Sequence, residues 1–116
     1  MAKPNNLAKE GELIAFMILQ RDGFTILETN WRFQKSEIDI IAKKDGYLIF
    51  TEVKTRKKKK FEKPSDAIHK KKIARYKDAV EVYLEQYPSE DEIRFDEVNI
   101  IIGKDETQIE HIPNAF

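Results

Sequence analysis

The spacing of apolar residues predicts two helices and five strands. Asn5 or Asn6 caps a first helix, and Gly23 ends it in the C′ position that favours glycine. A second helix begins at residues 64–66 and runs to about Tyr87, where Pro88 stops it. The expected strands are residues 24–33, 37–43, 47–54, 93–102 and 108–112, with a loop over 55–63. This order, α-β-β-β-α-β-β, predicts one α/β domain over residues 1–116 with a mixed central sheet flanked by helices, and residues 1–5 are expected to be flexible.

The two strands around residues 37–54 are apolar on both faces. One face is expected to carry Ile38, Ile40 and Ala42 together with Ile49, Thr51 and Val53, and the other Ile41 and Phe50. Strands that are apolar on both faces usually lie in the middle of a sheet that helices cover on each side. The hairpin is therefore expected to be central.

The turn between these strands sets which side chains face each other. Asp45-Gly46 suits a two-residue type I′ turn, so Lys44 pairs with Tyr47. Counting outward from that pair places Asp39 opposite Glu52, and Glu37 opposite Lys54. Like charges directly opposite one another destabilise a sheet. The register therefore predicts a cation shared by Asp39 and Glu52, whereas a three-residue loop would shift the register by one and separate the pair.

Composition narrows the class of protein. The chain has 116 residues, enough for one domain with a real core, and it has no cysteine, which excludes disulfides and thiolate metal sites. No apolar run reaches the length of a membrane span, and the N-terminus lacks the apolar core of a signal peptide. We therefore expect a cytoplasmic protein that does not contact membranes.

The candidate site combines acids with a lysine, a set that suits Mg²⁺ or Mn²⁺ at a phosphodiester. Asp39 and Glu52 would hold the metal with the carbonyl oxygen of Val53, and Glu12 would bind directly or through water. Lys54 would orient the attacking water or stabilise charge on phosphorus. Two simpler interpretations stay open: Glu12 is a solvated acid in an early helical turn, and Lys54 forms a cross-strand ion pair with Glu37. The number of metal ions is also open.

Basic residues follow this site directly, although the net charge is +0, from 21 basic and 21 acidic residues. Positive charge beside a metal site suits a phosphate backbone, so these residues predict DNA binding. A solvated loop is the alternative. Lys72, in the second helix, is the lysine of that helix expected to point toward the sheet. The residues expected to bind nucleic acid are Arg56, Lys57, Lys58, Lys59, Lys60 and Lys72.

An ordered set of short motifs resembles the YraN family of small bacterial proteins, from about Asn6 to Phe116. The motifs are Gly11-Glu12, Gly23-Phe24, Asn30-Trp31-Arg32, the run SEIDIIA from Ser36 to Ala42, the run EVKTR from Glu52 to Arg56, Arg94-Phe95-Asp96 and Asn114-Ala115-Phe116. The resemblance implies a restriction-endonuclease-like fold, similar to Holliday-junction resolvases, with a PD-(D/E)xK type site. Glu12 then matches the helix acid, Asp39 the strand acid, Glu52 and Lys54 the ExK pair, and Lys72 a basic position in the second helix.

Three functions remain in competition. The leading hypothesis is a Mg²⁺- or Mn²⁺-dependent DNA endonuclease selective for branched DNA such as Holliday junctions. The second is a non-catalytic nucleic-acid-binding module on a nuclease fold, and the third is an interaction protein whose acids only stabilise the structure. The all-apolar run from Leu13 to Leu19 exceeds what one helix face needs, so a homodimer is also expected.

Overall fold

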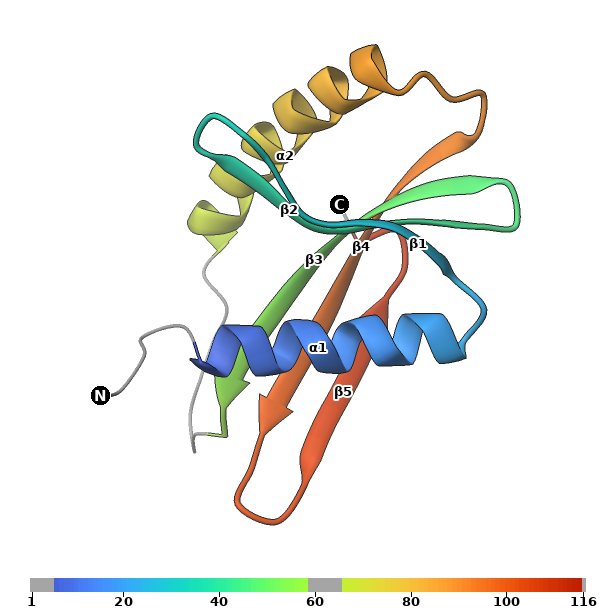
Figure 1. Ribbon diagram of the computed structural model, residues 1–116. Helices are drawn as coiled ribbons and strands as arrows, with labels where there is room; N and C mark the ends of the chain where they lie inside the picture. Colours follow the sequence, from blue (N-terminus) through green and yellow to red (C-terminus); the bar gives the residue numbers. More distant parts are fainter. Residues whose placement is uncertain (1–5, 59–65, 116) are drawn as a thin grey trace.

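The elements follow the expected order, α-β-β-β-α-β-β (Figure 1). The structure, a computed structural model, describes residues 6–58 and 66–115, with side chains in the second range described from residue 74 onward. The helices are α1 (Asn6–Arg21) and α2 (Asp66–Gln86). The strands are β1 (Thr25–Phe33), β2 (Ser36–Lys44), β3 (Tyr47–Lys57), β4 (Glu92–Ile102) and β5 (Thr107–Ile112).

The five strands form one mixed sheet in the order β1-β2-β3-β4-β5. The β3–β4 pair is parallel and α2 connects the two strands, while the other neighbours are antiparallel. β2 and β3 are thus interior strands, as their apolar faces predict, whereas β1 is an edge strand beside α1. In the described part of the chain, neither helix is long and apolar enough to cross a membrane.

Each helix covers one face of the sheet. On the α1 side, Ala15 and Leu19 pack with Ile40, Ile49 and Ile100. On the α2 side, buried residues of that helix, including Tyr76 and Tyr83, pack with strand residues of the second core. Trp31 and Phe50 each meet the Tyr83 ring edge-on, with ring centroids 5.4 and 5.7 Å apart. Two separate hydrophobic cores therefore hold the sheet between the helices.

The local turn signals are confirmed. Asp45 and Gly46 both have positive φ, 51° and 83°, as a type I′ turn requires, and Lys44 pairs with Tyr47. α1 ends in a Schellman motif: Gly23 has φ 94°, the Phe24 amide donates to the Leu19 carbonyl at 2.9 Å, and the Gly23 amide donates to that of Gln20 at 3.2 Å. The hairpin register and the end of α1 are both set by short-range sequence.

Two expectations about β2 and β3 were wrong. β3 continues to Lys57 because residues 55–57 pair with Ile100, Ile101 and Ile102 of β4, so the start of the basic segment is strand and not loop. Ile38 packs in the α2-side core, whereas Ile40, two residues later, packs in the α1-side core. Regular alternation would put both on one face, so β2 is irregular between them.

Candidate metal centre

β2 is irregular at Asp39. Asp39 would face Asn30 on β1, yet the pairing of the two strands skips that position between Thr29–Ile40 and Trp31–Ile38. On the other side, the pairing of β2 with β3 ends at Ile40–Thr51, one pair before Asp39 would meet Glu52. The regular cross-strand pairs therefore stop on both sides of Asp39, and its side chain takes over part of the pairing.

Asn30 marks the interruption on β1. Its φ is 52°, a left-handed conformation that asparagine tolerates better than most residues. On β3, an Asp39 carboxylate oxygen (Oδ2) accepts a hydrogen bond from the Val53 amide at 2.8 Å. The carboxylate thus bonds to the backbone of β3 where the regular ladder has ended. Val53 reaches the site through its amide nitrogen, and ligation by its carbonyl stays a prediction.

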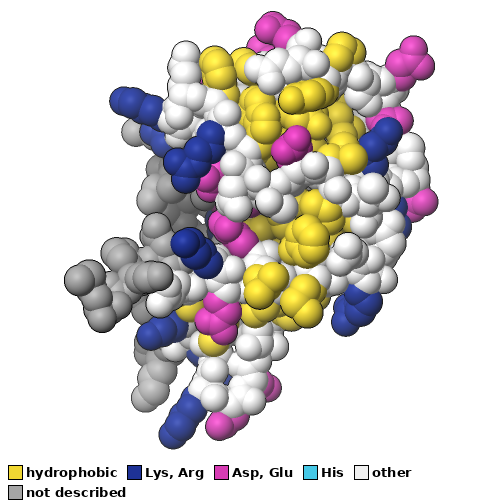
Figure 2. Space-filling model, in the orientation of Figure 1, with side chains coloured by type: hydrophobic (Ala, Val, Ile, Leu, Met, Phe, Trp, Pro, Cys, Tyr) yellow, Lys and Arg dark blue, Asp and Glu magenta, His cyan; other side chains and the backbone are white. Residues whose placement is uncertain are grey.

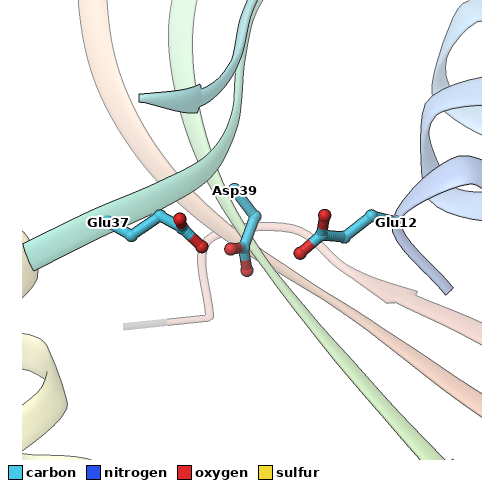
Figure 3. A group of neighbouring side chains, drawn as sticks. All are labelled: Glu12, Glu37 and Asp39. Atoms are coloured by element: carbon cyan, nitrogen blue, oxygen red, sulfur yellow. The ribbon is translucent and has the colours of Figure 1, made fainter. Parts of the chain in front are cut away.

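Three carboxylates converge around this irregularity: Glu12 from α1, and Glu37 and Asp39 from β2. Figure 3 shows Asp39 between the other two, with the carboxylate groups turned toward one another. One oxygen from each residue lies within 4.8 Å of the others. Glu37 was not among the predicted ligands, because the register placed it opposite Lys54.

Gly11 brings α1 close enough for Glu12 to take part. Gly11 is buried, and a methyl group in place of its hydrogen would overlap the side chain of Thr55 on β3. Only glycine allows the helix backbone to approach the strand this closely. Glu12, the next residue, is half-buried, and its carboxylate lies beside those of Glu37 and Asp39, so its role as a ligand stays a prediction.

Burial and mutual repulsion perturb these acids. Burial, together with Glu12, Glu37 and Glu52 nearby, raises the pKa of Asp39 from 3.8 to about 7, although the Val53 amide partly opposes the change. Burial and then Glu37 raise the pKa of Glu12, against a hydrogen bond from the Asn30 side chain. Such values indicate negative charge brought together without enough compensation from the protein itself.

Glu52 joins Asp39 across a cavity. Its side chain is 1% exposed, and a cavity of 210 Å³ is lined by Glu37, Asp39 and Glu52 with Tyr76 and Arg75 of α2. Among the described residues, the compact three-acid cluster does not include Glu52. The Tyr76 hydroxyl donates to the Thr51 carbonyl at 3.0 Å and so ties α2 to β3 beside Glu52. The predicted acids Asp39 and Glu52 therefore share a cavity, with Tyr76 as a neighbour that sequence reasoning did not single out.

Lys54 has a different partner from the one expected. Its Nζ lies 3.1 Å from Glu97 on β4, and the Asn99 side chain donates to the other Glu97 oxygen at 3.0 Å. Glu37 is instead paired with Arg32 of β1, at 2.8 Å. The cross-strand pair of Lys54 with Glu37 was wrong, because β3 and β4 run parallel and bring Glu97 alongside Glu52.

The predicted basic residues divide into two groups. Arg56 and Lys57 lie at the end of β3, and Lys58 follows, 3.7 Å from Glu106. Lys59 and Lys60 lie outside the described residues, as does the side chain of Lys72, whose backbone belongs to α2. Of these predicted residues, the structure therefore describes the side chains of Arg56, Lys57 and Lys58, which follow Lys54 along β3 and beyond its end.

The donor set suits a hard divalent cation. The cluster supplies carboxylate oxygens, the ligands that Mg²⁺ and Mn²⁺ prefer, and a cation would offset the burial and the repulsion that together raise the pKa of Asp39. A signal for Glu37 was present in the sequence, since it lies two residues from Asp39. Asn30 was less clearly indicated by the sequence. No turn motif surrounds it that would predict a left-handed backbone conformation inside a strand.

The comparisons with known proteins agree with the resemblance seen in the sequence. Residues 11–100 match the family described as "Uncharacterised protein family UPF0102". A UPF0102 protein of Christiangramia forsetii is 45% identical over 116 residues, covering 100% of this chain and 98% of the relative. UPF0102 protein FP2501 of Flavobacterium psychrophilum is 44% identical over the same length and coverage, and a Parabacteroides distasonis relative is 39% identical with 96% of its length covered. The chain therefore belongs to the UPF0102 family, also known as YraN.

Proposed function

We propose that this protein is a metal-dependent endonuclease that hydrolyses phosphodiester bonds in DNA, with Mg²⁺ or Mn²⁺ as cofactor. The observation that carries the proposal is the cluster of Glu12, Glu37 and Asp39, in which the pKa of Asp39 is raised to about 7. Bringing three acids together costs stability, because like charges repel and burial disfavours the ionised form. An arrangement of this kind is typical of a site that binds a cation.

Asp39, Glu37 and Glu12 would hold the metal, with Glu52 and the Val53 carbonyl as further candidate ligands. When bound, the cation would polarise a phosphoryl oxygen and lower the pKa of a bound water. The Val53 amide orients Asp39, and the Asn30 side chain, which lowers the pKa of Glu12, lies beside that carboxylate. The protein thus supplies ligands whose positions are set before substrate arrives.

Lys54 would supply positive charge at the scissile phosphate and orient the attacking water. It follows Glu52 by two residues on β3, so both side chains project from the same face of the strand. Its pairing with Glu97 limits the directions in which the ammonium can point. Farther along β3, Arg56 and Lys57 would contact the phosphate backbone of the DNA. We further propose that the substrate is branched DNA and that the protein acts in the cytoplasm.

The test is cleavage of labelled DNA by the purified full chain with Mn²⁺, using a four-way junction, a flap and a continuous duplex. The wild type should cut at least one substrate, and Asp39→Asn should lose activity while keeping its circular dichroism spectrum. Glu110→Gln, which neutralises an exposed acid on β5, is the matched control and should cut like the wild type. Full activity in Asp39→Asn would refute the mechanism. If neither the wild type nor any variant cleaved DNA, but Asp39→Asn still bound DNA in a salt-dependent manner, the non-catalytic binding module would be favoured.

A further inference from the structure

A groove lies between α1 and the edge strand β1, on the α1 side of the acid cluster. Its volume is 640 Å³, within the range of about 300–1,000 Å³ typical of small-molecule sites. Leu13 and Phe16 of α1 form an apolar wall, and Asn30 and Arg32 of β1 lie on the strand side. The groove therefore combines an apolar wall with polar groups at its opposite side.

The apolar wall is unusual for a surface helix. Leu13 is 61% exposed, and the next turn of α1 carries Met17, which is 59% exposed. Figure 2 shows hydrophobic side chains exposed along α1, with acidic side chains among them. Leu13 lines the groove, whereas Met17 does not. Exposed apolar surface next to a candidate active site is typical of a binding surface.

The groove is continuous with the acid cluster. Glu12 and Glu37 belong to the three-carboxylate cluster and also line the groove. Arg32, paired with Glu37 at 2.8 Å, and Lys9 of α1 add positive charge along it. A ligand in the groove would thus have an apolar portion against Phe16 and Leu13, and a negatively charged portion between these cations and a metal-bearing cluster.

A nucleotide has this distribution of chemistry: a flat base with π-faces joined to a phosphate. In continuous duplex DNA both faces of each base are stacked on neighbours, so only an unpaired base can lie against an aromatic side chain. We infer that the groove receives an unpaired base of the DNA strand whose phosphate lies at Glu12, Glu37 and Asp39. This inference rests on the proposed nuclease function, and it specifies the substrate as DNA with an unpaired nucleotide beside the scissile phosphate.

Binding can be measured separately from cleavage. The probe is a DNA hairpin carrying 2-aminopurine in a short single-stranded overhang, in Ca²⁺ buffer with the full chain, compared with a blunt hairpin. Wild-type protein should quench the 2-aminopurine fluorescence, since stacking quenches this base, and bind the overhang on the order of tenfold more tightly than the blunt end. Leu13→Ser and Phe16→Leu should lose most of the preference and the quenching.

Met17→Ser is the matched control, because Met17 has nearly the exposure of Leu13 on the same helix but lies outside the groove. It should behave like the wild type. The inference would be overturned if the protein cleaved blunt and overhang hairpins equally in Mn²⁺ and if Leu13→Ser left that cleavage unchanged. The nuclease function would then still stand. No cleavage of any substrate would overturn both. If sedimentation showed that the wild type is a dimer and that Leu13→Ser is a monomer, the groove would be an interface between two copies of the chain. This result would also overturn the inference.

Discussion

The carboxylate of Asp39 accepts a hydrogen bond from the backbone amide of Val53 at 2.8 Å, at the point where the regular pairing of β2 with β3 has ended. An acid that replaces a main-chain partner in this way is held in a fixed orientation, because the donor belongs to the sheet itself. Its remaining oxygen is available to face Glu12 and Glu37. The same interruption that frees Asp39 from the ladder therefore creates the cluster.

Without metal, Asp39→Asn should stabilise the protein at alkaline pH. The folded protein holds the Asp39 proton more tightly than the unfolded chain, whose pKa is near 3.8, so the free energy of unfolding falls as pH rises from about 4 to about 7. The change in the Asp39 pKa is equivalent to a free energy of about 4 kcal/mol. This value is an upper bound for the increase in the free energy of unfolding of Asp39→Asn at pH 8. Urea unfolding with EDTA at pH 4.5 and 8 measures it. Equal stability of variant and wild type at pH 8 would contradict the pKa of Asp39.

Mn²⁺ should bind more weakly at pH 6 than at pH 8, because Asp39 must lose its proton to serve as a ligand. With a pKa of about 7, the ionised fraction falls from about nine-tenths to about one-tenth over that range, so the affinity should drop on the order of tenfold. Titration calorimetry at both pH values measures this. Constant affinity across the range would mean that Asp39 is not a ligand.

Glu37→Gln should weaken Mn²⁺ binding at pH 8 on the order of tenfold or more, because Glu37 supplies one of the clustered oxygens. The same substitution removes the partner of Arg32, whose side chain is 75% exposed, so stability should change little. Calorimetry on this variant and on Glu110→Gln, which should match the wild type, tests the assignment. Unchanged affinity in Glu37→Gln would restrict the site to the other acids.

Gly11→Ala should move Glu12 away from the cluster. The added methyl group overlaps Thr55, so α1 must shift, at a cost of about 1–3 kcal/mol for an overpacked contact. Metal affinity should fall together with stability. The double variant Gly11→Ala/Thr55→Gly should recover affinity, since the obstructing side chain is gone. If the double variant binds metal no better than Gly11→Ala, the close approach of α1 does not position Glu12.

Asp96→Asn should destabilise the protein without affecting metal binding. The Asp96 carboxylate is fully buried and accepts two bonds from Arg94 at 2.8 Å and one from the Asn114 amide at 3.0 Å, with His111 at 2.7 Å. Burial alone would raise the pKa of Asp96, but the hydrogen bonds from His111 and Arg94 outweigh it and lower the pKa.

A lowered pKa means that this stabilisation is present at neutral pH and lost as pH falls through the acid range. We expect a loss of about 3–5 kcal/mol at pH 7, as for other broken buried ion pairs, and a smaller loss in acid. Chemical unfolding at pH 7 and at pH 2, well below the unfolded-chain pKa of 3.8, measures the difference. A penalty that does not shrink in acid would argue against ionised Asp96 as its source.

The sequence by itself determined the features that depend on near neighbours. Asp45-Gly46 specified the hairpin and its register, Gly23 the end of α1, and apolar faces the central position of β2 and β3. The predicted acids Asp39 and Glu52 do share a cavity, because two residues facing one side of a hairpin must lie close together.

Only the tertiary structure decided the composition of the cluster and the partner of Lys54. Glu37 lies two residues from Asp39, but local sequence neither brings Glu12 of α1 beside them nor specifies the left-handed Asn30 on β1. Lys54 pairs with Glu97 because a parallel strand, reached through the whole of α2, lies beside β3. Glu12 arrives through the contact of Gly11 with Thr55, and contacts between residues so far apart along the chain depend on how complete helices and strands pack.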